Sequence, residues 1–467
     1  MNSNRREFLR LSGLAGIGLA GSPWIKENQE KSTVRQLQSG AAHFNMCGYA
    51  APKIETVRIG FIGLGNRGPD AVARMNRIEG VSIMALCDIR PEKVNAVKKS
   101  LEGSRHNPDM YTGKEDEWKK VCERKDIDLI YIATPWSLHT PMAVYAMQEG
   151  KHACVEVPAA KTIEECWQLV ETSEKTRRNC MILENCCYDF FELLTLNMVR
   201  QGIFGEIIHG EGAYIHDLLE GNFSKTKYYD MWRLKENFRN GNLYPTHGLG
   251  PVAQAMNINM GDKMDWLVSV SSRDSMMAPR ANELAAKDDF YKPFSGKKYR
   301  GNMNTTSIMT HKGNTIMLQH DVTSPNIYSR IYKISGTRAS ALKYPLPGRV
   351  AFGDENWLSP EQFAELEKKY EPPIVAKLGV MAKEVGGHGG MDFLMDWRTI
   401  DCLRNGLPLD INVYDAASWS SIGPLSETSV ANHSAAVQIP DFTSDSWKTN
   451  QPVDILLQKG ANTGVIK

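Results

Sequence analysis

Three closely spaced glycines near the start of the chain have the residue type and spacing to bind an anion. Gly63, Gly65 and Gly68 directly follow the apolar run 57–62 and precede the alanine- and valine-rich segment 71–75. In such a pattern the first glycine permits a tight turn, the second lets the backbone approach a pyrophosphate, and the third lets a helix pack on a strand. The spacing therefore predicts a dinucleotide site at the N-terminus of a helix.

An acidic residue, Asp88, ends the next apolar run, 81–87, about 20 residues beyond the glycines. A carboxylate at this place in a dinucleotide fold accepts hydrogen bonds from the adenosine ribose and repels a 2′-phosphate. We therefore expect the cofactor NAD rather than NADP, a preference that Arg90 could weaken. In the alternative interpretation, Asp88 caps the helix expected to begin near Pro91.

These residues lie in an alternation of apolar runs and helical segments, which predicts an α/β fold with an N-terminal Rossmann domain, a doubly wound parallel sheet, over residues 56–185. Its strands are expected at 57–62, 81–87, 127–133, 152–155 and 180–183. Ligands of such sheets bind beyond the carboxyl ends of the strands. One crevice should therefore be lined by the segments 136–139, 156–158 and 184–188.

The second half of the chain predicts a C-terminal α+β domain, residues 186–435, built on an open, mostly antiparallel sheet. Its strands are expected at 207–214, 266–271, 315–321 and 329–335. An open sheet face favours pairing, so we expect a homo-oligomer through this sheet. Residues 436–467 are polar and weakly periodic, which indicates a packed C-terminal tail.

The length, charge balance and cysteine pattern of the chain indicate what kind of molecule it binds. The 467 residues exceed what one hydrophobic core usually serves, and 55 basic against 54 acidic residues leave a net charge of +1. This balance argues against nucleic acid or an anionic membrane and favours a small molecule. The nine cysteines show no C-x-x-C spacing and fall mostly in apolar runs, so we expect buried thiols and no metal site.

The first residues resemble a twin-arginine export signal. Arg5 and Arg6 are followed by Phe8-Leu9 and a Gly- and Ala-rich apolar stretch, 11–21, which is too short to span a bilayer. A chance basic helix start is the alternative. We expect residues 1–21 to be the signal, 22–55 an N-terminal extension, and the protein to be periplasmic, with no membrane-spanning segment elsewhere.

The crevice segments resemble the family of glucose–fructose oxidoreductase and inositol dehydrogenase (Gfo/Idh/MocA), whose dehydrogenases typically carry Glu-Lys-Pro after the fifth strand. Here Glu156-Val157-Pro158 stands in that place, and a valine cannot move a proton. Together with Gly-Leu-Gly-Asn-Arg-Gly at 63–68, Pro-Trp-Ser-Leu-His at 135–139 and Glu-Asn-Cys-Cys-Tyr at 184–188, this pattern resembles glycoside hydrolase family 109. That family contains NAD-dependent α-N-acetylgalactosaminidases.

The resemblance implies two sets of site residues. Contacts to NAD, besides the three glycines, are expected from Asn66, Arg67, Asp88, Trp136, Ser137, Leu138, His139, Glu156, Val157, Asn185 and Tyr244. The sugar is expected to contact Tyr214, Arg233, Tyr244, Pro245, Thr246, His247 and Tyr328, with Tyr244 and His247 as the catalytic acid/base pair. Taken singly, each tyrosine is more commonly a half-buried sheet residue whose hydroxyl bonds to a neighbour.

The resemblance also implies a reaction: removal of a terminal α-linked N-acetylgalactosamine (GalNAc) through oxidation at C3, elimination, addition of water and reduction. Three alternatives stay open. These are an exported NAD(P)-dependent sugar dehydrogenase or sugar–sugar oxidoreductase, a noncatalytic NAD-holding sugar sensor, and a conventional glycosidase with carboxylates from Glu156, Glu211 or Asp217. His388, among four glycines at 386–390, marks a close approach to substrate or a simple turn, and we assign it no catalytic role.

Overall fold

The computed structural model describes residues 43–466 except 354, 453 and 455. The predicted export signal and most of the predicted N-terminal extension therefore lie outside the described residues. The compact unit Asn45–Lys467 is described below. Among the described residues, no helix is both long and apolar enough to cross a bilayer.

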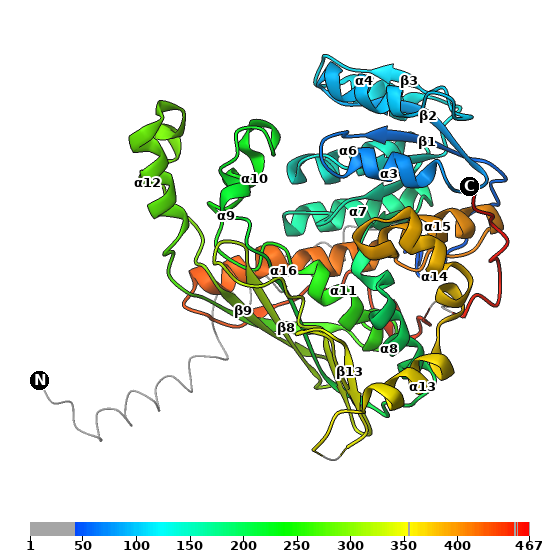
Figure 1. Ribbon diagram of the computed structural model, residues 1–467, viewed down its shortest axis with the longest axis vertical. Coiled ribbons are helices and arrows are strands. Elements are labelled where there is room, and N and C mark those ends of the chain that lie inside the picture. The colour runs from blue at the N-terminus through cyan, green and yellow to red at the C-terminus, as the bar shows by residue number, and fades with distance from the viewer. Residues whose placement is uncertain (1–42, 354, 453, 455, 467) are drawn as a thin grey trace, which may run out of the picture. The chain divides into compact units, whose positions relative to one another are not determined.

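A parallel six-stranded sheet occupies the first half of this unit (Figure 1). Its order is β3-β2-β1-β4-β5-β6, which confirms the predicted Rossmann topology. The strands are β1 (Val57–Ile62), β2 (Val81–Cys87), β3 (Asp109–Tyr111), β4 (Leu129–Ile132), β5 (His152–Val155) and β6 (Cys180–Ile182). The central strands are buried along almost their whole length, which explains why they are continuous apolar runs rather than alternating ones.

Helices connect these strands and place their N-termini at the carboxyl edge of the sheet. They are α3 (Gly68–Met75), α4 (Pro91–Ser100), α5 (Glu117–Glu123), α6 (His139–Gln148) and α7 (Ile163–Thr176). Proline in the first turn starts α3 and α4, and the Thr162 hydroxyl caps α7 by accepting from the Glu165 backbone N–H. Local signals therefore determine where α3, α4 and α7 begin.

An eight-stranded sheet forms the second half, in the order β13-β12-β11-β7-β10-β9-β8-β14. Only β7 and β10 pair in parallel, so the predicted open and mostly antiparallel sheet is confirmed. The strands are β7 (Ile207–Ile215), β8 (Met264–Ser271), β9 (Asn304–Thr310), β10 (Thr315–Asp321), β11 (Lys333–Gly336), β12 (Ser340–Leu342), β13 (Arg349–Ala351) and β14 (Val437–Gln438). A strand was expected from residue 329, but β11 begins only at Lys333. Ser329 makes a single isolated bridge to Ile215.

The register of the second sheet separates its two faces. One cross-strand row joins the buried residues Leu267, Ile308, Ile316 and Ile334, and the helix α11 (Thr246–Ala255) packs on that side. The next row, on the opposite face, joins Val268, Ser307, Met317, Glu211 and Lys333. The apolar-polar alternation along each strand therefore corresponds to one face buried under helices and one mixed face.

The contact between α11 and β7 is unusually close because it is made of glycines. A Cβ added to Gly212 would lie 2.4 Å from the carbonyl oxygen of Gly248, and one added to Gly210 would lie 2.4 Å from the Val252 side chain. With no Cβ at these positions, the helix rests directly on the strand. The start of α11 and the end of β7 are thereby fixed side by side.

Late segments of the chain return to the Rossmann sheet. The helix α15 (Met391–Asn405) packs against α3 and β1, and α16 (Val413–Ala431) packs against α7, β6 and β8 (Figure 1). Trp397 and Trp419 are fully buried in these contacts, and Val465 in the predicted C-terminal tail pairs with Ile78. The helix α8 (Phe190–Arg200) continues from the Rossmann part into the second sheet.

Arg233 lies in a group of helices that follow β7 and β8 in sequence. The helices are α9 (Leu219–Asn222) and α10 (Trp232–Glu236), after β7, and α12 (Met277–Lys287), after β8. Their segments share a small core of Phe223, Met231, Leu234, Met277, Ala281, Tyr291 and Tyr299. Figure 1 shows α10 and α12 as the green helices at the upper left. The remaining helices, α13 (Pro360–Tyr370) and α14 (Pro373–Val385), lie between the second sheet and α15 in sequence.

Candidate active site

The glycine turn after β1 has the geometry that a dinucleotide requires. Gly63 has a positive φ of 93°, and a Cβ there would lie 2.5 Å from the carbonyl oxygen of Ala133. A Cβ at Gly68 would lie 2.0 Å from the carbonyl oxygen of Gly63, whereas one at Gly65 would meet only the end of the Arg90 side chain, at 3.3 Å. Gly63 and Gly68 thus close the turn, and Gly65 leaves its backbone accessible to a pyrophosphate at the N-terminus of α3.

Asp88 is placed at the carboxyl end of β2, as expected for a ribose-binding acid. Its Oδ2 accepts a hydrogen bond from the Leu64 backbone N–H at 2.7 Å, and its Oδ1 accepts from the backbone and Nε of Arg90, both at 3.0 Å. The carboxylate therefore ties the glycine turn to the start of α4. Arg90 lies beside it with its guanidinium engaged by the same carboxylate.

Residues predicted to contact NAD meet at the carboxyl edge of the sheet. Arg67 Nε donates to Glu156 Oε1 at 2.9 Å, which joins the glycine turn to the end of β5. Trp136, in the short helix η2 (Trp136–Leu138), is buried and lies next to Tyr244, with ring centroids 5.6 Å apart. His139 is fully buried, its Nδ1 2.7 Å from the carbonyl oxygen of Pro158 and its Nε2 2.8 Å from that of Thr134. The His139 side chain thus holds two crevice loops together.

The residues predicted to bind sugar form one aromatic cluster. Tyr244 is central to it: its ring centroid lies 4.6 Å from that of Tyr214 and 4.8 Å from that of His247, and the Arg233 guanidinium lies 5.4 Å from its ring. Trp136, from the Rossmann sheet, also lies 5.5 Å from Arg233. The cluster therefore combines the cofactor end of the first sheet with the buried side of the second.

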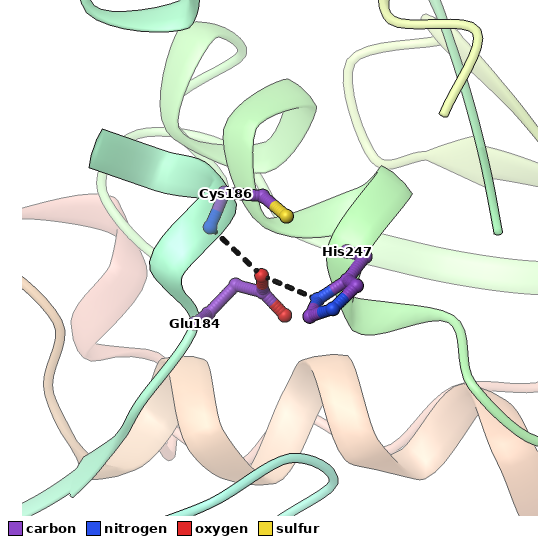
Figure 2. A group of neighbouring side chains, drawn as sticks. All are labelled: Glu184, Cys186 and His247. Atoms are coloured by element: carbon purple, nitrogen blue, oxygen red, sulfur yellow. Dashed lines mark hydrogen bonds and ion pairs between the residues drawn. The ribbon is translucent and has the colours of Figure 1, made fainter. Parts of the chain in front are cut away.

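His247 is joined to a buried carboxylate (Figure 2). Its Nδ1 lies 2.7 Å from Oε1 of Glu184, which also accepts a hydrogen bond from the Cys186 backbone N–H at 3.1 Å. Burial raises the pKa of Glu184, but the adjacent His247 and the hydrogen bonds outweigh burial and hold that pKa below its ordinary value. Glu184 is therefore ionised, which orients the imidazole and leaves its Nε2 available for proton transfer.

The sulfur of Cys186 lies close to this pair, and the donor atoms of Glu184, Cys186 and His247 fall within 4.8 Å of one another (Figure 2). Burial raises the pKa of the Cys186 thiol well above its usual range, and the positive charge of Arg330 offsets this only in part. Metal binding uses the thiolate, and structural zinc sites use four ligands. The chemistry of the three groups is thus that of a hydrogen-bonded acid/base pair beside a neutral thiol.

The three predicted sugar-site tyrosines are neutral phenols. Burial raises the pKa of Tyr244 well above its ordinary value, and the Tyr214 phenol adds to this increase while Arg233 opposes it. Burial likewise raises the pKa of Tyr214 and of Tyr328. At neutral pH these hydroxyls can donate a proton or a hydrogen bond.

Tyr328 is held at the edge of the cluster by a buried group of charges. Its ring lies 6.3 Å from that of Tyr214 and 6.0 Å from that of Tyr344, above whose ring the guanidinium of Arg330 lies at 5.6 Å. The group itself consists of Arg330 and Lys343 paired with Asp189 and Glu192 at distances of 2.6 to 2.8 Å. Such a network fixes the segment that carries Tyr328.

The structure also shows what sequence reasoning missed. The glycines on both sides of residues 244–247 predict a loop there, but Thr246 and His247 form the first turn of α11, preceded by Pro245. Glu184 was expected only as part of a crevice segment, and nothing in the sequence indicates that it pairs with a histidine 63 residues away. A carboxylate directly at the end of a buried parallel strand was the available signal.

The carboxylates considered for a conventional glycosidase are engaged elsewhere. Glu156 pairs with Arg67, Glu211 pairs with Lys333 on the mixed face of the second sheet, and Asp217 caps the Leu219 backbone N–H. These side chains have separate partners on separate elements, so the structure does not present them as an acid/base pair.

Comparison with known proteins agrees with both halves of this description. Residues 57–183 match the oxidoreductase family with an NAD-binding Rossmann fold, and residues 188–449 match the glycosyl hydrolase 109 C-terminal domain. An α-N-acetylgalactosaminidase of Bacteroides fragilis is 50% identical over 411 residues, 86% of this chain and 96% of the relative. A glycosyl hydrolase family 109 protein of Phocaeicola vulgatus is 48% identical over 413 residues, covering 86% of this chain and 98% of the relative.

Solved structures share the fold at much lower identity. A levoglucosan dehydrogenase in complex with NADH is 17% identical and has a TM-score of 0.60, covering 83% of this chain and all of the other. A scyllo-inositol dehydrogenase from Lactobacillus casei with bound NAD(H) and scyllo-inositol is 14% identical, with a TM-score of 0.58 and coverage of 82% and 99%. With its NAD-binding Rossmann domain joined to this C-terminal domain, and with close relatives along most of its length, the chain belongs to glycosyl hydrolase family 109.

Proposed function

We propose that the protein is an α-N-acetylgalactosaminidase that uses NAD as a recycled cofactor. The observation that carries the proposal is the pair of His247 and ionised Glu184 set among neutral tyrosines at the cofactor end of the Rossmann sheet. The family and the Bacteroides fragilis relative supply the substrate class, a terminal α-linked GalNAc. The place of Val157, where dehydrogenases of this fold carry lysine, argues against simple alcohol oxidation.

NAD, when bound, supplies reversible oxidation of the sugar at C3, which makes the hydrogen on C2 acidic. The glycine turn, Asp88 and Arg67 would hold it, and Trp136, which packs on Tyr244, would contact it from the side of the sugar cluster. His247 accepts a proton at Nε2, and Glu184 stabilises the resulting imidazolium through Nδ1–H. The Tyr244 hydroxyl donates a proton, and Arg233 provides positive charge beside Tyr244 for hydroxyl and acetamido oxygens.

The decisive experiment is NMR of the purified protein with an aryl α-N-acetylgalactosaminide in heavy water, with no NAD added. Release of the aglycone with deuterium entering C2 is the expected result, because the C2 proton is lost to the protein and replaced from solvent. If no aglycone is released, and free sugar with added NAD instead produces stoichiometric NADH, the protein is a dehydrogenase. Binding of sugar with neither reaction would indicate a sensor.

The acid/base assignment is tested by Tyr244→Phe and His247→Ala. Both should abolish aglycone release while the purified variants retain NAD, since neither change touches the glycine turn or Asp88 and phenylalanine keeps the ring of Tyr244 that packs on Trp136. His209→Ala, on the mixed face of the second sheet beside Thr315, is the matched control and should retain full activity. Normal turnover in both site variants would overturn the assignment.

We propose further that the protein is exported by the twin-arginine route to the periplasm. The support is the order Arg5-Arg6, Phe8-Leu9 and a weakly apolar stretch up to residue 21. A protein that carries NAD is suited to a route that exports folded chains. Replacing Arg5 and Arg6 by lysine should keep the protein in the cytoplasmic fraction; unchanged periplasmic recovery of the variant would contradict the proposal.

A further inference from the structure

A short segment from the second half of the chain contacts the loops of the predicted cofactor crevice. It runs from Lys227 through the short helix η4 (Tyr229–Met231) to Trp232, the first residue of α10. We call this segment, residues 227–232, the strap. Its last residue directly precedes Arg233 of the sugar cluster, so the strap is continuous in sequence with the predicted sugar site.

Two contacts join the strap to residues that are predicted to bind NAD. The carbonyl oxygen of Lys227 accepts a hydrogen bond from Nδ2 of Asn66, in the glycine turn after β1, at 3.1 Å. The ring of Trp232 lies 5.4 Å, centroid to centroid, from that of Trp136, in the loop after β4. The strap therefore reaches the carboxyl edge of the Rossmann sheet from the other half of the chain.

The third contact is made by Tyr229. Its ring centroid lies 5.2 Å from the guanidinium carbon of Arg90, a distance at which a cation and an aromatic ring attract each other. Nε of Arg90 donates to Asp88 at 3.0 Å, and a Cβ placed on Gly65 would lie 3.3 Å from the end of the same side chain. Arg90 thus lies beside both the expected ribose-binding acid and the glycine turn, where the adenosine half of NAD would bind.

Buried residues on both sides of Tyr229 fix its place in the strap. Tyr228 is buried, with the guanidinium of Arg233 5.5 Å from its ring, and Met231 enters the small core of the neighbouring helices. Asp230 and Met231 have positive φ, 51° and 52°, which turns the chain sharply between these two anchors. Tyr229 itself stays 48% exposed. A ring held outside the core adds little to that core, so its function is to be sought at the crevice.

We propose that Tyr229 is a positioning residue for NAD, which acts by holding the guanidinium of Arg90 against the adenosine half of the bound dinucleotide. A planar guanidinium that packs on one ring can stack a second ring, here adenine, on its opposite face. Contact with Tyr229 restricts the long arginine side chain before the cofactor binds, which lowers the entropy lost on binding. The half of the chain that carries the sugar site thereby also retains the cofactor. The inference rests on NAD binding and not on GalNAc release, so the two can fail separately.

The test measures how fast bound NAD leaves the protein. Protein loaded with NAD and freed of excess is mixed with isotopically labelled NAD, samples are desalted at intervals, and mass spectrometry of the bound cofactor gives the exchange rate. Tyr229→Ala should exchange NAD on the order of fivefold faster than the unaltered protein, because a partly exposed cation–π contact is lost. Tyr229→Phe keeps the ring and should exchange at nearly the unaltered rate. Glycoside turnover does not enter the readout.

A double-variant cycle shows whether Tyr229 acts through Arg90. Arg90→Ala alone should also speed exchange, and adding Tyr229→Ala to it should bring no further increase, since the partner of the ring is already gone. Trp357→Ala is the matched control: it removes another partly exposed ring, 40% exposed and 5.5 Å from Arg349 on β13, and should exchange at the unaltered rate. Exchange by Tyr229→Ala within about twofold of this control would overturn the proposal, and so would a double variant whose increase is the product of the two single effects.

Discussion

Oε1 of Glu184 lies 2.7 Å from Nδ1 of His247, although the first residue follows the last strand of the Rossmann sheet and the second lies in the first turn of α11, which packs on the other sheet. The pair therefore spans the two halves of the chain. Because Nδ1 is held by a buried carboxylate, the orientation of the imidazole is fixed beside the rings of Tyr214 and Tyr244. The relative position of the two sheets therefore determines whether this contact forms.

Replacement of Glu184 by glutamine should lower kcat on the order of a hundredfold or more, with a smaller effect on KM. The amide can still accept from Nδ1–H, but it supplies no charge to stabilise the imidazolium. The measurement is steady-state hydrolysis of an aryl α-N-acetylgalactosaminide, with bound NAD quantified in the same preparation. Glu206→Gln, at an exposed position before β7, should be unaffected, and equal kcat values for the two variants would contradict the role of Glu184.

Replacement of Asp88 by serine should shift cofactor preference from NAD toward NADP. The carboxylate that binds ribose hydroxyls is removed, and Arg90 is released from it to meet a 2′-phosphate. Fluorescence titration of cofactor-free protein should show NAD affinity falling about tenfold while NADP affinity rises. The double change of Asp88→Ser with Arg90→Ala should lose the gain for NADP; a gain that persists would show that Arg90 is not the phosphate ligand.

The buried ion pairs of Arg330 and Lys343 with Asp189 and Glu192 should make the free energy of unfolding depend on pH in the acid range. Burial would raise the pKa of Asp189, but Lys343 and Arg330 outweigh it and lower that pKa from 3.8 to about 2. A lowered folded-state pKa gives stability that is present above pH 4 and lost as pH falls through about 2. Asp189→Asn should therefore reduce the free energy of unfolding by roughly 2 kcal/mol at pH 7, with the difference shrinking below pH 4.

Urea unfolding of both proteins at several pH values measures this difference. Asp289→Asn, whose side chain is 87% exposed, should leave the free energy of unfolding unchanged and serves as the control. A difference between the proteins that stays constant from pH 7 to pH 2 would contradict an electrostatic origin.

The mixed face of the second sheet should pair with a second copy of the chain. Val268 lies in its cross-strand row next to Ser307, and Val270 on the same strand is 58% exposed. If a homo-oligomer forms there, Val268→Glu should dissociate it, because the new charge would be buried in the interface. Light scattering after size exclusion checks the mass, with Val380→Glu on α14 as the matched control. A monomeric unaltered protein would contradict the pairing.

The positions of many strands could be predicted because each is encoded by a local sequence pattern. The bounds of β1, β2, β5 and β10 agree with the expected ranges, since each is an apolar or alternating run closed by a polar residue or glycine. The strand β9 was not expected, because its sequence, Asn-Thr-Thr-Ser-Ile-Met-Thr, is largely polar and its pairing partners lie on either side only in the folded sheet. Local periodicity does not reveal such non-local pairing.

The predicted site residues gather as the resemblance implied, but their partners could not be found from sequence. Glu184 for His247, and Asp392 for Arg67 and Asn185, are contacts across long separations that depend on how α11 and α15 dock. The docking is decided by glycines and buried ion pairs whose function appears only in three dimensions. Their contributions to NAD and sugar binding stay predictions until the variants above are measured.

The backbone contact between Gly212 and Gly248 fixes the distance between the two elements that carry Tyr214 and His247. Tyr214 lies two residues after Gly212, and His247 directly precedes Gly248. The two backbones are in van der Waals contact at these glycines, so no side chain lies between them. The distance between these two positions is therefore determined by the main chain, and substitution of neighbouring side chains should change it little. The segment that carries Arg233 can consequently change in sequence while the spacing of Tyr214 and His247 is preserved.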